Sequence, residues 1–437
     1  MLQELTKQID TANSKFHQVI KIIQDTNDTI YLTGKAGTGK STLLNHIKET
    51  VNKNFITLTP TGIAAINIKG ATIHSFFKFP LRPLLPDDKE IERFRKNSWR
   101  RKAIEKMETL IIDEVSMVRA DIMDAIDCSI RKNGGDPKLP FGGKQLLLVG
   151  DLFQLEPVVT NKGGEADIIN GIYKSAYFFD ALIFRNISLQ TIELQKIYRQ
   201  SDPHFIELLG RVRNGNVTDA DLDALNQRCI EPGYEIIDDY RITLTATNYL
   251  AENLNRQMMR LLETPSFHFK GALEGHFPSD RYPTLMELEL KLGAQVMFVK
   301  NDDLNRYVNG SIGIISDINE DDIEVELPSG KFIDIRIAIW ENYQYTWNRS
   351  KKTISQDLIG TFKQLPIKPA WAITIHKSQG LTLDKVNIDL GRGAFAGGQT
   401  YVALSRCSSL EGLNLSRPIT KEDIFVDERV KEWMVGG

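Results

Sequence analysis

The residues best suited to chemistry lie in residues 28–42, DTIYLTGKAGTGKST. Gly34 and Gly39 precede Lys40 and Ser41 at the spacing of a phosphate-binding loop, in which several backbone N–H groups turn toward one phosphate chain. Lys40 would reach the β and γ phosphates, and the Ser41 hydroxyl would hold Mg²⁺. A glycine-rich turn that matches by chance is the alternative, but a β-prone run before the loop and a helical pattern after it favour a nucleotide. We predict contacts from Gly34, Ala36, Gly37, Thr38, Gly39, Lys40, Ser41 and Thr42.

Two carboxylates and an amide follow two further apolar runs, at 110–112 and 146–149. After a strand of a phosphate-loop enzyme, Asp113 would join the Mg²⁺ shell, and Glu114 would orient or deprotonate the attacking water. The amide of Gln154 would bond the γ-phosphate or that water. A solvated strand end and a loop amide bonded to backbone are the alternatives. The second acidic residue favours hydrolysis over a kinase reaction.

Two arginines could sense the nucleotide from a second domain. Arg199 lies in LQKIYRQ, and Arg406 lies in YVALSRCSS, where we read the apolar residues as a strand. A guanidinium is always charged and forked, so it suits a γ-phosphate at a domain interface. Each arginine alone is more often a surface salt-bridge residue, and Arg406 is the better candidate because an apolar segment precedes it.

A compact polar loop, HKSQG, follows another apolar run. His376, Lys377 and Ser378 offer donors to phosphodiester oxygens, whereas Gln379 and Gly380 could approach the nucleotide. A lone histidine is usually structural. The clustering of these residues at a predicted strand end favours a binding role.

The elements that must position these residues alternate between apolar strands and helical stretches, which predicts an α/β doubly wound parallel sheet. Functional residues at strand carboxyl ends fit the ligand-binding edge of that architecture. A second such series begins near Arg241 and resumes at Ala370. Between them, short β-prone runs punctuated by Asn309-Gly310 and Ser329-Gly330 predict an inserted β-barrel.

Composition sets outer limits on the class of protein. The chain has 437 residues, 41% of them hydrophobic and 25% charged, and its 54 basic and 57 acidic residues give a net charge of −3. The three cysteines show no paired spacing, which argues against disulfides and structural zinc. No apolar run predicts a membrane span or a signal peptide. The basic run at 93–102 is compatible with a solvated helix face or with phosphate contact.

Taken together, the motifs resemble those of superfamily 1 group B DNA helicases, most closely the Pif-type (petite integration frequency) helicases, which are related to RecD-like enzymes. The resemblance runs from Gln18 to about residue 413. It is carried by GKAGTGKST (34–42), TPTGIAA (59–65), TIHSFF (72–77), LIIDEVSM (110–117), DIMDAIDCSIRKN (121–133), PFGGKQLLLVGDLFQLEPV (140–158), LQKIYRQ (194–200), LTATN (244–248), AITIHKSQGLTLD (372–384) and YVALSRCSSLEGL (401–413). Glu156 stands where the family often has proline.

The resemblance implies two tandem RecA-like domains with ATP between them and single-stranded DNA across their tops. Residues 1–180 would form domain 1A with a wedge (1B) at about 78–103, and residues 181–437 would form domain 2A with an SH3-like barrel (2B) at about 290–365. Gln18 would read the adenine. DNA contacts are expected from Thr61, Gly62, His74, Ser75, Thr247, Asn248, His376 and Ser378.

The implied function is ATP- and Mg²⁺-dependent unwinding with 5′ to 3′ translocation, acting at single-strand to duplex junctions in replication, repair, recombination or telomere-type maintenance. G-quadruplexes and RNA–DNA hybrids stay open as substrates. We expect a cytoplasmic, nucleoid-associated protein of bacterial or phage type, monomeric without DNA. Two alternatives remain: a DNA-independent phosphate-loop ATPase that remodels proteins, and a non-catalytic nucleic-acid-binding module.

Overall fold

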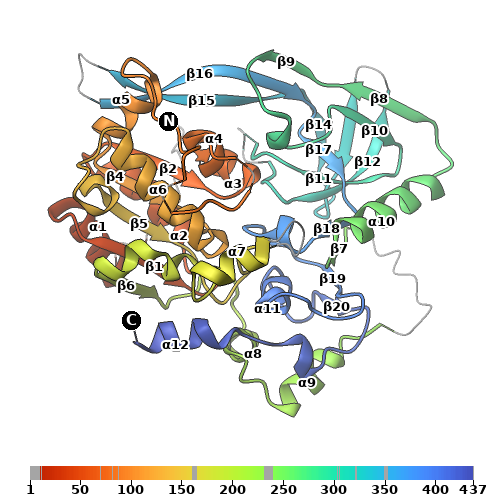
Figure 1. Cartoon of the computed structure of the whole chain (residues 1–437). Helices are drawn as coiled ribbons and strands as arrows, with labels where there is room; N and C mark the ends of the chain where they lie inside the picture. Colours follow the sequence, from red (N-terminus) through yellow and green to blue (C-terminus); the bar gives the residue numbers. More distant parts are fainter. Residues whose placement is uncertain are drawn as a thin grey trace.

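Two parallel β-sheets form the two centres of the computed structural model, and antiparallel sheets lie beside them (Figure 1). The predicted α/β class with two parallel sheets is therefore confirmed. The structure describes Asp10 and residues 12–68, 70–80, 82–86, 88–159, 165–230, 240–302, 304, 306–319, 322–348 and 353–436.

The first sheet has six parallel strands in the order β3-β2-β4-β5-β1-β6. Their carboxyl ends meet at one edge, so residues that follow β1, β4 and β5 come together there. The strands are β1 (Thr29–Gly34), β2 (Phe55–Thr59), β3 (Ala71–Thr72), β4 (Thr109–Ile112), β5 (Gln145–Val149) and β6 (Leu189–Leu194).

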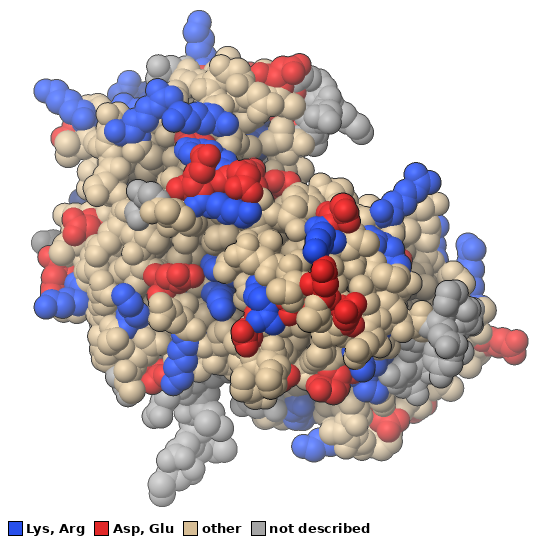
Figure 2. Space-filling view, turned by 90° about the horizontal axis from the view of Figure 1, so that it is seen from below, with Lys and Arg blue, Asp and Glu red and all other residues tan. Residues whose placement is uncertain are grey.

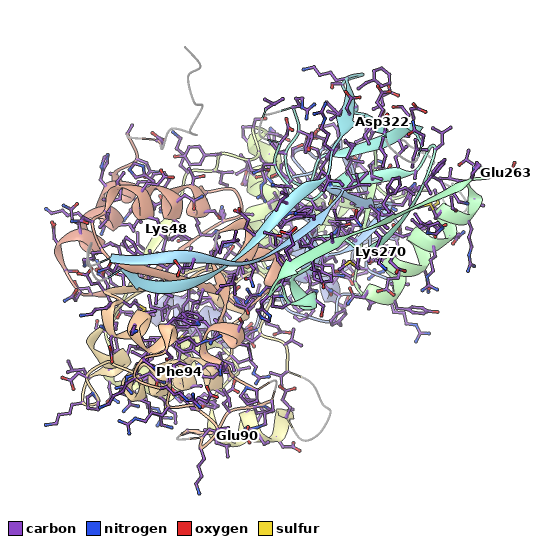
Figure 3. The ribbon with its side chains drawn as sticks, turned by 90° about the horizontal axis from the view of Figure 1, so that it is seen from above. Lys48, Glu90, Phe94, Glu263, Lys270 and Asp322 are labelled. Carbon is purple, nitrogen blue, oxygen red and sulfur yellow. The ribbon has the colours of Figure 1, made fainter. Side chains whose placement is uncertain are left out.

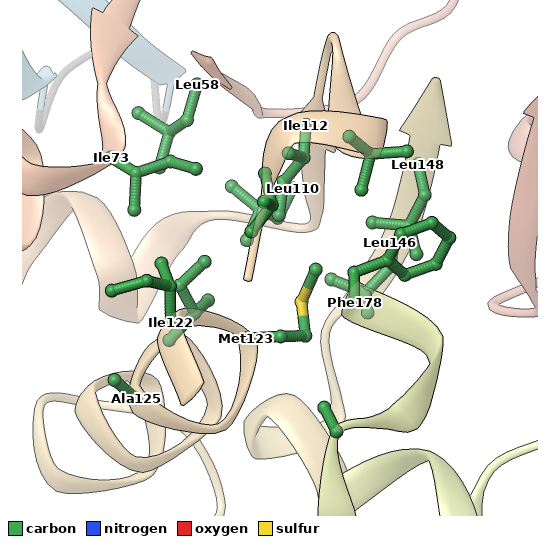
Figure 4. Packing of buried hydrophobic residues seen from close by; sticks show 14 of the residues in the cluster. Leu58, Ile73, Leu110, Ile112, Ile122, Met123, Ala125, Leu146, Leu148 and Phe178 are labelled. Carbon is green, nitrogen blue, oxygen red and sulfur yellow. The ribbon is translucent and has the colours of Figure 1, made fainter. Parts of the chain in front are cut away.

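Helices cover this sheet on both faces, and their apolar stripes fill the core (Figure 1). In Figure 4, Ile122 and Met123 of α6 pack against Leu110 and Leu146 of the sheet, burying apolar surface that anchors β4 and β5. The helices are α1 (Ser14–Asp25), α2 (Lys40–Thr50), α3 (Gly62–Asn67), α4 (Ile73–Phe77), α5 (Trp99–Lys106), α6 (Ala120–Lys132) and α7 (Glu165–Ile172), with 3₁₀ turns η1 (Val115–Met117), η2 (Pro140–Gly143), η4 (Phe178–Asp180) and η5 (Leu182–Asn186).

The second sheet is parallel with the order β18-β7-β19-β20. Its strands are β7 (Ile242–Thr245), β18 (Ala372–Thr374), β19 (Val386–Asp389) and β20 (Leu413–Leu415). Around it lie α8 (Pro203–Asn214), α9 (Asp219–Asn226), α10 (Asn248–Leu261), α11 (Gln399–Leu404), η7 (His376–Ser378) and η8 (Lys421–Asp423).

Two sequence-based expectations differ from these elements. The first sheet continues past residue 180, because β6 pairs with β1 up to Leu194. The apolar residues before Arg406 form helix α11 and not a strand. A run this short fits either periodicity, and Gly398, with φ 73°, starts the helix as its N-cap.

Antiparallel strands fill the predicted 290–365 insert and extend beyond it on both sides. One sheet has the order β14-β13-β12-β11-β17, a second β15-β16-β9 and a third β10-β8. The long β15–β16 hairpin crosses to the first domain and contacts α5 of the predicted wedge (Figures 1 and 3). The strands are β8 (Ser266–Lys270), β9 (Ala272–Gly275), β10 (Glu287–Lys291), β11 (Gln295–Phe298), β12 (Ile312–Ile318), β13 (Ile323–Glu326), β14 (Phe332–Ile335), β15 (Ala338–Asn348), β16 (Thr353–Gln364) and β17 (Ile367–Pro369); η6 is Ser279–Arg281.

The distribution of surface charge and the state of the cysteines agree with what the composition predicts. Positive and negative side chains are interspersed on the face seen from below (Figure 2). Cys128, Cys229 and Cys407 are all free thiols. Within the described ranges, no helix combines the length and apolar character needed to span a bilayer.

The last helix, α12 (Glu428–Gly436), leaves the second domain and packs on the first (Figure 1). Trp433 stacks on Phe179 with ring centroids 4.6 Å apart, and its edge contacts Tyr31 at 5.4 Å. Arg429 forms an ion pair with Asp180 at 2.5 Å. Helices α1 and α12, near the two ends of the described residues, therefore both pack on the first domain.

We expect Trp433→Ala to lower the free energy of unfolding of the first domain by about 2 kcal/mol, since a partly buried aromatic ring is lost. Guanidinium unfolding followed by circular dichroism measures it. Val435→Ala, on the same helix and 89% exposed, should change stability by less than about 0.5 kcal/mol. Equal effects of the two variants would contradict this packing.

Candidate nucleotide and nucleic-acid site

The phosphate loop joins β1 to α2, and its glycines are required by the backbone. Gly34, Gly37 and Gly39 have φ angles of 150°, 79° and 83°, which L side chains rarely adopt. A Cβ on Gly34 would lie 2.6 Å from the carbonyl oxygen of Leu194, and one on Gly37 would lie 2.5 Å from Cβ of Arg199. The loop and the connection to the second domain therefore lie against each other.

Lys40 starts α2 and points back into the loop. Its Nζ donates to the carbonyl oxygens of Gly34 at 2.7 Å and Lys35 at 3.2 Å. Burial lowers the pKa of Lys40, and the charges of Asp151 and Glu114 oppose that shift. The ammonium group is thus held within the loop, where a phosphate would replace carbonyl oxygens as its partner.

Asp113 and Glu114 follow β4 at the same sheet edge. Glu114 has φ 53°, a left-handed conformation that is uncommon for a side chain of this kind. Burial raises the pKa of Asp113 to about 7, with the Glu114 charge adding to the rise, and burial likewise raises the pKa of Glu114. The charges of Lys40, Arg406 and Arg199 act on Glu114 and oppose that rise.

Both arginines are packed between the domains. Arg199 donates to the carbonyl oxygen of Ser405 at 3.3 Å. Arg406 is 2% exposed, and burial, followed by the charge of Arg199, lowers its pKa to about 9. Arg406 donates to the oxygens of Val402 and Ser405 at the end of α11. A fully buried guanidinium next to a half-buried one is suited to a polyanion.

Tyr401 is a site residue that the sequence reasoning missed. Its hydroxyl accepts the backbone N–H of Ala36, in the phosphate loop, at 2.9 Å, and burial raises its pKa to about 12. Tyr401 belongs to α11, so the second domain touches a backbone group that would otherwise face a phosphate. Its position within YVALSR was the available signal, but reading that segment as a strand hid which residues face the loop.

The segment after β5 carries Gln154 and is held from both sides. The Gln154 side-chain amide donates to the carboxylate of Asp151 at 3.3 Å. Asp151 in turn accepts hydrogen bonds from Arg213 of α8. Further along, Glu156 accepts the backbone N–H of Gly397 at 3.3 Å. The predicted γ-phosphate residue thus lies at the contact between the domains.

Gly398→Ala is expected to reduce DNA-stimulated ATP hydrolysis by about tenfold through lost alignment of the two domains. Gly398 has φ 73°, and an added Cβ would overlap the carbonyl oxygens of Phe153 and Gln154. Steady-state turnover with single-stranded DNA measures the effect. Gly330→Ala is the matched control, because Gly330 has φ 74° with open space around it and should leave turnover unchanged. Wild-type turnover by Gly398→Ala would contradict the alignment.

Three other predicted nucleotide residues, Gln18, Gln379 and Gly380, lie on α1 and directly after η7. Gln18, on α1, accepts from Lys15 Nζ at 3.3 Å, and its neighbour Phe16 lies next to Gly39. Gln379 and Gly380 follow η7 beside the predicted DNA residues of that loop. The Gln379 Nε2 is buried and lacks a hydrogen-bond partner in the part of the chain that the structure describes. Their nucleotide contacts stay predictions.

The predicted DNA residues of the first domain lie after strands β2 and β3. Thr61 and Gly62 lie at the start of α3, and His74 and Ser75 lie in α4. Burial lowers the pKa of His74, which favours its neutral form. Arg100, from the predicted basic run, donates to the oxygens of Phe76 and Ser75, at 2.9 and 3.3 Å. The basic run therefore supports this segment directly.

The predicted DNA residues of the second domain lie after β7 and β18. Thr247 caps α10 by accepting the N–H of Leu250, and with Asn248 it is exposed. His376 is half-buried, and burial lowers its pKa. Ser378 is fully buried, and its hydroxyl donates to the carbonyl oxygen of Ile375 at 2.7 Å. This hydrogen bond stabilises the conformation of the loop.

The donors near the phosphate loop fit a magnesium ion of the kind bound together with a nucleotide. Ser41 is exposed at the start of α2, and Asp113 offers a carboxylate. Among the described residues, no group of three or more His, Cys, Asp or Glu could form a metal cluster by itself. Mg²⁺ usually takes one or two protein ligands and fills its shell with water and phosphate oxygens.

Comparisons with known proteins show which family this chain is similar to. A family model described as PIF1-like helicase matches residues 8–223. The chain is 32% identical over 397 residues to the ATP-dependent DNA helicase Pif1 of Bdellovibrio bacteriovorus, covering 89% of this chain and 84% of that protein.

Two solved structures of Pif1 from Bacteroides differ in how well they match. The complex with ADP-AlF4 is 37% identical, with 97% of this chain and 96% of that chain covered and a TM-score of 0.88. The structure bound to single-stranded DNA is 36% identical, with 98% and 97% covered and a TM-score of 0.69. Both matches span the two parallel sheets and the antiparallel insert, which confirms the predicted tandem RecA-like domains.

Proposed function

The chain belongs to the PIF1-like helicase family and is an ATP-dependent DNA helicase; from this premise we propose that it moves 5′ to 3′ along single-stranded DNA and separates the duplex ahead. The observation that carries the proposal is the contact of the second domain with the phosphate loop. Tyr401 bonds the Ala36 N–H, Arg199 bonds the Ser405 oxygen, and the charges of Arg199 and Arg406 act on Glu114. We therefore expect a bound triphosphate to change how the domains meet.

We assign hydrolysis to residues from both domains. Ser41 and Asp113 would hold Mg²⁺, which when bound would act as a Lewis acid and neutralise phosphate charge. Glu114 would take the proton of the attacking water, a task suited to a carboxylate whose pKa burial has raised. Lys40 would hold the phosphate chain, and Arg199 and Arg406 would stabilise charge from the opposite side.

DNA binding is proposed to follow the strand ends of both sheets. Residues predicted to touch DNA lie on the first domain after β2 and β3 and on the second after β7 and β18. Domain closure and opening would then alternate two grips on one strand. The lower match to the DNA-bound Bacteroides structure, at similar identity, supports a domain arrangement that differs between states.

Unwinding of duplexes with either a 5′ or a 3′ single-stranded tail tests the motor and its direction together. We expect separation of the 5′-tailed duplex, ATP turnover that rises with single-stranded DNA, and strong salt dependence without sequence preference. Unwinding from the 3′ tail alone would overturn the direction. Turnover indifferent to DNA would favour the alternative, an ATPase that remodels proteins.

We further propose that the protein is a monomer in the absence of DNA. We also propose that it accepts structured substrates such as G-quadruplexes and RNA–DNA hybrids, because contacts to the nucleic-acid backbone do not read the bases. A cytoplasmic, nucleoid-associated location follows from a DNA substrate. Sedimentation with and without a tailed duplex, and unwinding of a 5′-tailed G-quadruplex, test the first two proposals. A dimer without DNA, or an inert G-quadruplex, would contradict them.

A further inference from the structure

A buried ion pair joins the two domains next to the nucleotide site. Asp151, after β5 of the first sheet, is 1% exposed, and Arg213, at the end of α8, is 4% exposed. The guanidinium donates to the carboxylate through Nε at 3.2 and 3.3 Å and through Nη2 at 2.9 Å. Paired donors of this kind fix direction as well as distance.

Asp151 also holds the segment that contains Gln154. Its carboxylate accepts the backbone N–H of Phe153 at 3.2 Å and the Gln154 side-chain amide at 3.3 Å, and its carbonyl oxygen accepts the Gln154 N–H at 2.9 Å. The position of the Gln154 amide therefore depends on the Asp151 carboxylate, which is itself hydrogen-bonded to Arg213.

The surroundings of Arg213 leave it little freedom. Its guanidinium carbon lies 4.2 Å from the centroid of the Phe153 ring, and Nη2 lies 3.4 Å from a carboxylate oxygen of Glu193 on β6. Val212 and Leu209 anchor the same helix in the core of the second domain. A shift of α8 relative to the first sheet would thus pull on Asp151.

Stability alone does not account for such a pair. Buried ion pairs are often no more stabilising than apolar residues of the same volume, because two charges lose their water. What the pair supplies is a fixed geometry between α8 and the segment after β5. Among the groups assigned to phosphate binding, Asp151 bonds the Gln154 amide, and its charge also acts on Lys40 and Glu114.

We propose that Arg213 is a positioning residue for ATP hydrolysis, which holds Gln154 in place through Asp151 and ties that placement to the position of the second domain. The inference rests on the proposed role of Gln154 toward the γ-phosphate. Arg213→Lys keeps the charge but loses the paired donors, so it should misplace the amide while leaving nucleotide binding nearly intact.

The test is steady-state ATP turnover with saturating single-stranded DNA. Arg213→Lys and Asp151→Asn should each lower kcat by about 10- to 100-fold, with KM for ATP changed by less than about threefold. Adding Arg213→Lys to Gln154→Ala should lower kcat by less than about twofold more, because the amide that Arg213 positions is already gone.

Arg211→Lys is the matched control. Arg211 lies on the same helix, but its partners Glu207 and Asp221 belong to the second domain, so turnover should stay at the wild-type level. Thermal unfolding by circular dichroism verifies that each variant is folded, and Asp151→Asn carries the test if Arg213→Lys does not fold.

The possible results distinguish a failure of the positioning role of Arg213 from a failure of the proposed motor function. In an enzyme whose wild-type turnover rises with DNA, normal kcat in Arg213→Lys and Asp151→Asn would overturn the positioning role. Losses that multiply on the Gln154→Ala background would overturn it as well, since Arg213 would then act independently of Gln154. Absent DNA stimulation in the wild type would instead count against the proposed motor.

Discussion

Lys40→Ala is expected to lower ATP hydrolysis by at least about a thousandfold and to abolish unwinding, because a preorganised charge facing the phosphates is removed. The ammonium bonds the carbonyl oxygens of Gly34 and Lys35, so the loop itself holds the lysine in position. Phosphate release with single-stranded DNA and strand separation of a 5′-tailed duplex measure the two effects.

Lys48→Ala is the control for that experiment. Lys48 lies in the last turn of the same helix and bonds the carbonyl oxygen of Ile68 at 2.8 Å, so the same charge is removed away from the phosphate loop. Turnover should stay within about twofold of the wild type, because the lost charge lies at the other end of the helix from Lys40. Unwinding by Lys40→Ala at the wild-type rate would refute the assignment of this loop.

Glu114→Gln is expected to lower hydrolysis by about 10²- to 10⁴-fold while ATP still binds, because the shape stays and only the proton acceptor is lost. The raised pKa of Glu114 has burial as its main cause, so removing the charge should not weaken the folded protein. Single-turnover hydrolysis and fluorescent-nucleotide titration separate chemistry from binding.

Glu108→Gln offers the comparison at the opposite end of the same strand. Glu108 accepts the backbone N–H of Asn54 at 2.8 Å, a bond that an amide oxygen can keep. Its turnover should match the wild type. A Glu114→Gln variant that loses nucleotide affinity and turnover in equal measure would indicate a binding residue and not a base.

The phosphate loop, the two carboxylates and the alternation of strands were predictable because local sequence determines them. Gly34 and Gly39 mark backbone that needs positive φ, and the runs before Asp113 and Gln154 are buried strands, as their apolar character indicates. These features depend on a few consecutive residues, so no knowledge of distant partners is needed.

The contacts between the domains could not be predicted in the same way. Tyr401 and Ala36 are 365 positions apart, and Arg213 lies in a helix whose charged residues look alike in sequence. Arg211 pairs within its own domain, whereas Arg213 crosses to Asp151. Which arginine faces inward depends on how α8 packs, and that follows from tertiary structure.

The return of α12 to the first domain has a mechanical consequence. In the described part of the chain, the backbone passes between the domains at residues 195–202 and again at 425–427. Two covalent connections between the domains define an axis that passes through both of them. We therefore expect the second domain to rotate mainly about that axis, because twisting across it would strain both connections.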